Sequence, residues 1–182
     1  MKAPNWKTCS EEELWKFVGY HLSQAGIESV LVGGAVVAVY SKGAYRSGDL
    51  DFVTQRGTNA EVQKVLESIG FEKVRGRHYE HPECSHLIIE FPPGPISIGE
   101  DYKIKPEEIT IEGQTIRIFN PTDCIRDRPA SYIHFQAREC LDQAVLVAQN
   151  QPVNLKKIKD WCASEGAEKI YDEFENKIKK QW

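Results

Sequence analysis

The sequence lacks an apolar run long enough to cross a membrane. Its longest apolar stretch, Val30–Tyr40, is interrupted by two glycines, whereas a membrane-spanning helix needs about 20 apolar residues. The N-terminal segment MKAPNWKTCSEEEL also lacks the apolar core of a secretory signal. We therefore expect a cytoplasmic protein without a membrane partner.

Cysteine is sparse and scattered. None of the five cysteines is spaced C-x-x-C with another, and an odd number of thiols does not suit a disulfide framework. Such cysteines are typical of the reducing cytosol. A surplus of positive charge is missing as well, because 23 Lys and Arg against 27 Asp and Glu leave a formal charge of -4. A general nucleic-acid coat, which is basic overall, is therefore not expected.

Three common signatures of enzyme and nucleotide sites are absent. The P-loop pattern G-x-x-x-x-G-K-[ST] does not occur, and neither does the dinucleotide fingerprint G-x-G-x-x-G. The G-x-S-x-G elbow that exposes a nucleophilic serine is also missing. These absences argue against a P-loop NTPase, a Rossmann dehydrogenase and an α/β-hydrolase.

The 182 residues, of which 41% are apolar, suit one globular domain. Ser10 and Glu13 have the spacing of a capping box, so a helix should begin after Ser10 and end near Gly26. A second helix should run from Thr58 or Asn59 to residue 69. Apolar and β-branched patterns predict strands. These strands cover residues 29–32, 49–54, 71–79, 86–91, 109–111 and 115–119, with a polar turn HPECS after the third and a hairpin formed by the last two.

Residues 35–40 are ambiguous, because their β-branched side chains favour a strand whereas their place after Gly33-Gly34 favours a short buried helix, which we prefer. From Asn120-Pro121 onward the pattern is helical, and Pro129 should break or begin a helix. Further helices are predicted over residues 137–150, 154–164 and 167–180.

This order of elements predicts an α/β fold of the α+β kind, with a small mixed β-sheet flanked by helices and a helical C-terminal portion. We expect residues 1–120 to form the core and residues 121–182 to pack on it, within a single compact unit.

Asp49 and Asp51 are the most informative residues for chemistry. In the strand DLDFVT they share one face, because successive side chains of a strand point to opposite sides. Two carboxylates held side by side repel each other, and a hard dication relieves that repulsion. Mg²⁺ binds carboxylate oxygens together with substrate phosphates, so this strand is a candidate platform for phosphoryl chemistry.

Other residues could complete such a site. Gly33-Gly34 lies between a strand and a helix start, where backbone N–H groups can approach a phosphate closely. Arg46 and Ser47 precede the two aspartates and can bind triphosphate oxygens. Glu90, in the apolar strand LIIEF, is the best candidate for a third carboxylate of a two-metal site. The ordinary alternatives are a tight turn at the glycines and solvated strand residues for the carboxylates.

With these residues in place, the sequence resembles a known family. Gly-Gly, a spacer, Arg-Ser-x-Asp-Leu-Asp and a later strand carboxylate are similar to the nucleotidyltransferase fold of the DNA polymerase β superfamily. Within it, the chain resembles small bacterial proteins related to minimal nucleotidyltransferases and to AbiEii-type toxins of toxin–antitoxin systems.

The resemblance implies a role for each of these residues. The Gly-Gly pair and Ser47 would contact nucleotide phosphates, Asp49 and Asp51 would ligate Mg²⁺, and Glu90 would be the third carboxylate, which helps to activate the acceptor. The family reaction transfers a nucleoside monophosphate from an NTP to a hydroxyl and releases pyrophosphate. The implied partners are therefore an NTP and a hydroxyl acceptor on a protein, an RNA or a small molecule.

Two further hypotheses remain open. The family often has Ser or Thr after the second glycine, whereas Ala35 and Val36 follow here. A second hypothesis is therefore a non-catalytic member that binds nucleotide or protein, for instance as one half of a toxin–antitoxin pair.

The third hypothesis is a zinc protein, because His78, His81, Cys84 and His86 are all potential zinc ligands. Their spacing lacks the usual pattern of two close pairs that are far apart in the sequence, so a polar turn between two strands is the simpler interpretation.

Overall fold

The computed structural model describes residues 1–135 and 139–180, so the predicted helix 137–150 starts outside the described residues. The strands are β1 Glu28–Val32, β2 Asp49–Arg56, β3 Glu72–Arg75, β4 His78–His81, β5 Cys84–Glu90, β6 Glu107–Ile111 and β7 Gln114–Ile118. Within the described residues they form one seven-stranded sheet with the order β3-β4-β5-β2-β1-β7-β6. β1 pairs antiparallel with β2, and β2 pairs parallel with β5, so the sheet is mixed.

Three of the helices begin at a residue whose side chain caps them. The helices are α1 Glu11–Gln24, α2 Gly34–Tyr40, α3 Asn59–Ser68, α4 Pro121–Phe135, α5 Glu139–Asn150, α6 Leu155–Ser164 and α7 Glu168–Lys180. Both predicted N-caps of the first half, Ser10 and Thr58, form complete capping boxes. Asn154 caps α6 by accepting from the backbone N–H of Lys157. Residues 34–40 form a helix, as preferred from their place after the glycines.

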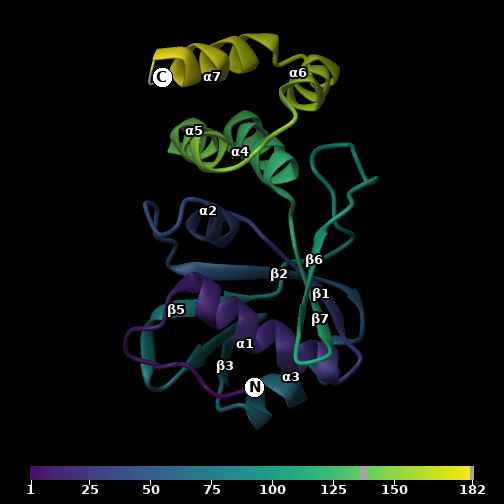
Figure 1. The fold of residues 1–182 in the computed structure, drawn as a ribbon. Helices are drawn as coiled ribbons and strands as arrows, with labels where there is room; N and C mark the ends of the chain where they lie inside the picture. The colour runs from purple at the N-terminus through teal and green to yellow at the C-terminus, as the bar shows by residue number, and fades with distance from the viewer. Residues whose placement is uncertain (136–138, 181–182) are drawn as a thin grey trace.

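Helices α1 and α2 pack directly on the sheet, whereas α4 to α7 form a further layer. α1 packs on β1 and β7, and α2 packs on β1 and β2. Figure 1 shows α2 lying between the sheet and a layer made of α4 to α7, and α2 contacts both α4 and α5. The predicted fold class, a mixed sheet flanked by helices with a helical C-terminal portion, is confirmed. No helix in the described ranges is long and apolar enough to span a bilayer.

The sequence-based prediction was wrong in three places. The predicted strand 71–79 is two strands, because Gly76 takes a positive φ of 58° and lets the chain turn between β3 and β4. The predicted turn HPECS is confined to Pro82-Glu83, since His81 and Cys84 pair across the hairpin. Pro129 lies inside α4 rather than at one of its ends. Its missing N–H costs one helical hydrogen bond, which burial of Cys124, Ile125 and Ala130 in the same helix offsets.

A buried polar network fixes α4 to its surroundings. Asp123 is fully buried and accepts hydrogen bonds from Asn120 at 2.7 Å, Arg126 at 2.8 Å and Lys157 at 2.7 Å. Arg126, 2% exposed, also pairs with Asp101. Because buried charges are costly unless they are paired, this network specifies how α4 meets α6 and the loop before β6.

Candidate active site

Three carboxylates converge on adjacent strands. In the parallel ladder of β2 and β5, Asp51 stands opposite Glu90, and Asp49 stands opposite Ile88. Asp49 and Asp51 share one face of β2, while Leu50 on the other face is fully buried. Ser47 Oγ donates a hydrogen bond to Asp49 Oδ1 at 2.7 Å. The carboxylates predicted to act together are therefore neighbours in the sheet.

Burial and the neighbouring carboxylates disfavour the ionised form of Asp51. Burial, and then the charges of Asp49 and Glu90, raise the pKa of Asp51 from 3.8 to about 7. Arg128 on α4 acts in the opposite direction and lowers this pKa. Oxygen donors crowded in this way suit a hard dication such as Mg²⁺, which would remove the repulsion. The residues present therefore fit a magnesium site.

The two glycines are required by the side chains that face them. Gly33 has a φ of +74°, and a Cβ there would overlap with an Asp51 carboxylate oxygen. A Cβ at Gly34 would lie 2.9 Å from Ser47 Oγ, closer than such atoms normally approach. Gly33 and Gly34 thus lie directly against the side chains of Asp51 and Ser47, which leave no room for a side chain at either glycine.

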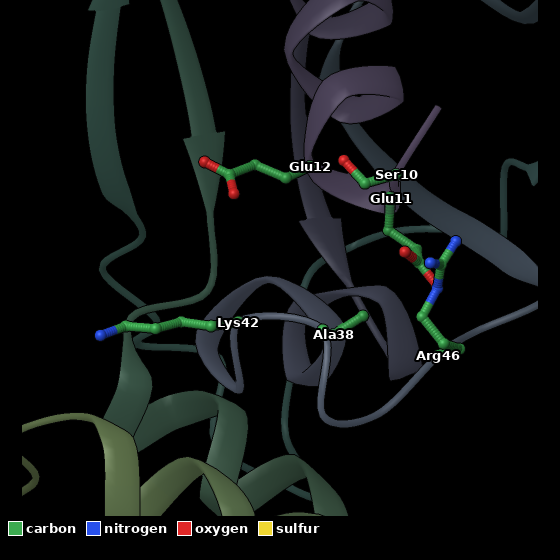
Figure 2. A pocket seen from close by; sticks show the side chains of 7 residues that line it. Ser10, Glu11, Glu12, Ala38, Lys42 and Arg46 are labelled. Carbon is green, nitrogen blue, oxygen red and sulfur yellow. The ribbon is translucent and has the colours of Figure 1, made fainter. Parts of the chain in front are cut away.

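Arg46 points to a different neighbour. Its Nε donates to Glu11 Oε1 at 2.9 Å, and the same carboxylate oxygen accepts from the Ser47 backbone N–H at 2.8 Å. Figure 2 shows the Arg46 and Glu11 side chains meeting beside a pocket, with Lys42 pointing away from them. This pocket has a volume of about 380 Å³. Buried Glu11 therefore holds the loop that carries Arg46 and Ser47, and it pairs with the charge of Arg46.

Two further residues, His78 and Arg128, lie near the carboxylates. His78 Nε2 lies 3.1 Å from Glu90 Oε1, because the two residues are paired between β4 and β5. Buried Arg128 pairs with Asp127 and donates to Gln143 at 3.1 Å. Its Nε has no hydrogen-bond partner among the described residues. No local pattern signals the contacts of His78 with Glu90 and of Arg128 with Gln143, because each joins segments that are separated in the sequence.

A second pocket, of about 200 Å³, opens beside the carboxylates. Val32, one of its lining residues, is the strand partner of Asp51. Its other lining residues are Val53, Pro92, Pro93, Pro95, Ile96, Ser97, Phe119 and Asp127. The pocket thus combines apolar walls with one acidic side chain.

The fold has known counterparts, although the sequence matches no protein-family model and no curated protein. An antigenic nucleotidyltransferase-like protein from Paracoccidioides brasiliensis aligns with a TM-score of 0.56 at 16% identity, over 77% of this chain and 76% of that chain. The antibiotic-resistance factor ANT(2'')-Ia aligns with a TM-score of 0.58 at 13% identity, over 90% and 95%. ANT(2'')-Ia in complex with adenylyl-2''-tobramycin aligns with a TM-score of 0.50 at 12% identity, over 90% and 96%. The chain therefore has the nucleotidyltransferase fold, as its sequence resemblance implied.

Proposed function

We propose that this protein is a Mg²⁺-dependent nucleotidyltransferase, which binds an NTP and transfers a nucleotide to a hydroxyl acceptor. The observation that carries the proposal is the meeting of Asp49, Asp51 and Glu90 on adjacent strands beside the Gly33-Gly34 loop. Solved proteins of this fold include one bound to an adenylylated acceptor, which supports the same reaction class.

Each residue has a defined task in this proposal. Asp49, Asp51 and Glu90 would hold Mg²⁺, which when bound neutralises charge that develops on the phosphates. Gly33-Gly34 and Ser47 contact the phosphates. The acceptor oxygen bonds to the α-phosphorus as the bond to pyrophosphate breaks. Its proton leaves toward Glu90, whose carboxylate His78 keeps in position.

The remaining parts of the site select and place the substrates. Arg128 is a positioning residue that supplies positive charge near Asp51. We assign the pocket of about 200 Å³ next to Asp51 to part of the substrate, either the base or the acceptor. For the acceptor hydroxyl we retain the three classes that the sequence resemblance implied, namely a protein, an RNA or a small molecule. We also place the protein in the cytoplasm, because its five cysteines are free and such thiols suit a reducing compartment.

The test of the proposal is calorimetric titration with each of the four NTPs, with and without Mg²⁺. We expect micromolar binding that requires Mg²⁺, and the preferred base identifies the donor for an acceptor search by pyrophosphate release. If no NTP binds in the presence of Mg²⁺, the enzyme proposal fails. The hypothesis of a non-catalytic module, for instance in a toxin–antitoxin pair, would then take its place and be tested by pull-down.

Substitution of Gly33 by Ala should abolish most of this binding. The new Cβ would displace the Asp51 carboxylate, so we expect nucleotide affinity to fall at least about 10-fold, comparable to losing a group that orients a metal ligand. Gly43→Ala is the matched control, because Gly43 also has a positive φ, of 81°, but no atom lies within 4 Å of the place that its new methyl group would occupy. Gly33, at φ 74° and ψ -154°, lies in a region that essentially only glycine adopts, so a thermal unfolding scan of both variants is needed to check that each remains folded. Equal affinity in the two variants would show that the contact with Asp51 is unimportant.

A further inference from the structure

A second group of potential metal ligands lies outside the carboxylate site. Cys9 lies just before α1, whereas Cys84 and His86 belong to β5. The Cys9 and Cys84 Sγ atoms are 3.8 Å apart, and Cys84 Sγ lies 3.8 Å from His86 Nδ1. One ligand atom from each of the three residues lies within 4.8 Å of the others. Both cysteines are only 1% exposed.

The two separations from Cys84 Sγ match those in a tetrahedral zinc site. With Zn–S bonds of about 2.3 Å and Zn–N bonds of about 2.05 Å, tetrahedral angles place two sulfurs about 3.8 Å apart and a sulfur and a nitrogen about 3.6 Å apart. A disulfide, in contrast, needs an S–S distance of about 2.05 Å. The cysteines therefore stand at the distance expected for two ligands of one zinc ion.

The orientation of the His86 ring provides a second, independent observation. His86 Nε2 lies 2.9 Å from the Cys9 carbonyl oxygen, which can only accept, so Nε2 carries the proton and donates. In the neutral ring this tautomer leaves the lone pair of Nδ1 on the side of Cys84. Metal-binding histidines are typically fixed in this way, with the other ring N–H donated to a carbonyl or carboxylate.

We propose that Cys9, Cys84 and His86 bind Zn²⁺, with solvent or an external ligand in the fourth position. Two thiolates and one imidazole favour zinc over Mg²⁺ or Ca²⁺, which prefer oxygen. The ion ties the segment before α1 to β5. Because Cys9 is two residues before Glu11, which accepts from the Ser47 backbone N–H, zinc also anchors the start of α1 next to the loop of the carboxylate site.

The ligand set differs from the one suggested by sequence spacing. His78 pairs with Glu90, and the buried His81 ring stacks on Trp6 with centroids 3.7 Å apart. Neither belongs to the group of ligand atoms around Cys84. The ligand that the spacing did not suggest is Cys9, which lies 75 positions before Cys84 in the sequence.

The experiment measures metal binding by the full chain, purified under a phosphine reductant. We expect stoichiometric zinc by mass spectrometry, and a thiolate-to-cobalt charge-transfer band when Co²⁺ replaces zinc. Cys84→Ser and His86→Ala should each weaken zinc binding at least about 10-fold. His86→Ala decides the result if Cys84→Ser fails to fold. Cys162→Ser, which alters a buried thiol on α6, should retain the metal.

Other results would overturn the proposal. Zinc that is lost on gel filtration together with no cobalt band would show that the three residues pack without a metal. Unchanged zinc affinity in His86→Ala would place the ion elsewhere. The variant Asp49→Asn/Asp51→Asn must keep the cobalt band, so this outcome is independent of whether the protein binds NTP.

Discussion

The double substitution Asp49→Asn/Asp51→Asn should reduce Mg²⁺-dependent NTP affinity at least about 100-fold. Loss of an outer-shell partner alone costs a metal site about 10- to 100-fold, and this variant removes the charge of two proposed ligands while it keeps their size. Calorimetry with the preferred NTP and Mg²⁺ measures the effect. Asp160→Asn is the matched control, because Asp160 is an exposed acid on α6 that pairs with Lys156. A double variant that still binds as tightly as the control would contradict a metal site on β2.

Unfolding measurements on an aspartate variant show whether it loses nucleotide binding because metal ligands are missing or because the fold is less stable. The pKa of Asp51 is raised from 3.8 to about 7 in the folded protein, so above pH 4 the unfolded chain ionises this group more easily and stability falls as the pH rises. The single variant Asp51→Asn should therefore be more stable than the wild type in metal-free buffer at about pH 8. Each pKa unit corresponds to about 1.4 kcal/mol, so the gain should reach a few kcal/mol and shrink as the pH falls from about 7 to about 4. Urea unfolding across this range measures it, and a less stable variant at about pH 8 would contradict the repulsion.

Substitution of Asp123 by Ala should destabilise the protein by about 3–5 kcal/mol, because removing one partner of a buried ion pair leaves the other charge uncompensated. Asp123 is fully buried and accepts from both Arg126 and Lys157. Arg126 is only 2% exposed and cannot turn to solvent, whereas Lys157 is 42% exposed on its side chain and can. Urea unfolding gives the free-energy difference.

Asp160→Ala is the matched control for this prediction. It also removes an acid that pairs with a lysine, but both partners are exposed, so the unfolding midpoint should not change measurably. A surface ion pair contributes at most about 1 kcal/mol to the free energy of unfolding. If Asp123→Ala lowered this free energy by less than that, pairing with Asp101 alone would be sufficient for Arg126. The network would then add little to the attachment of α4.

Features that depend on neighbours along the chain could be predicted from the amino-acid order alone. The capping boxes at Ser10 and Thr58 set where α1 and α3 begin, because cap hydrogen bonds join residues three apart. The alternation of side chains on β2 placed Asp49 and Asp51 on one face. The Gly-Gly pair marked the passage from strand to helix, since its backbone can adopt conformations closed to other residues.

Contacts between distant segments could be learned only from the folded chain. The register of β2 against β5 set Glu90 opposite Asp51, and the packing of α4 brought Arg128 near them. The same holds for Glu11, whose partner Ser47 lies 36 positions away, and for the contact of Cys9 with β5. No periodicity encodes such pairs, because they depend on which apolar surfaces pack together, and one register shift moves every side chain on a strand to a new neighbour.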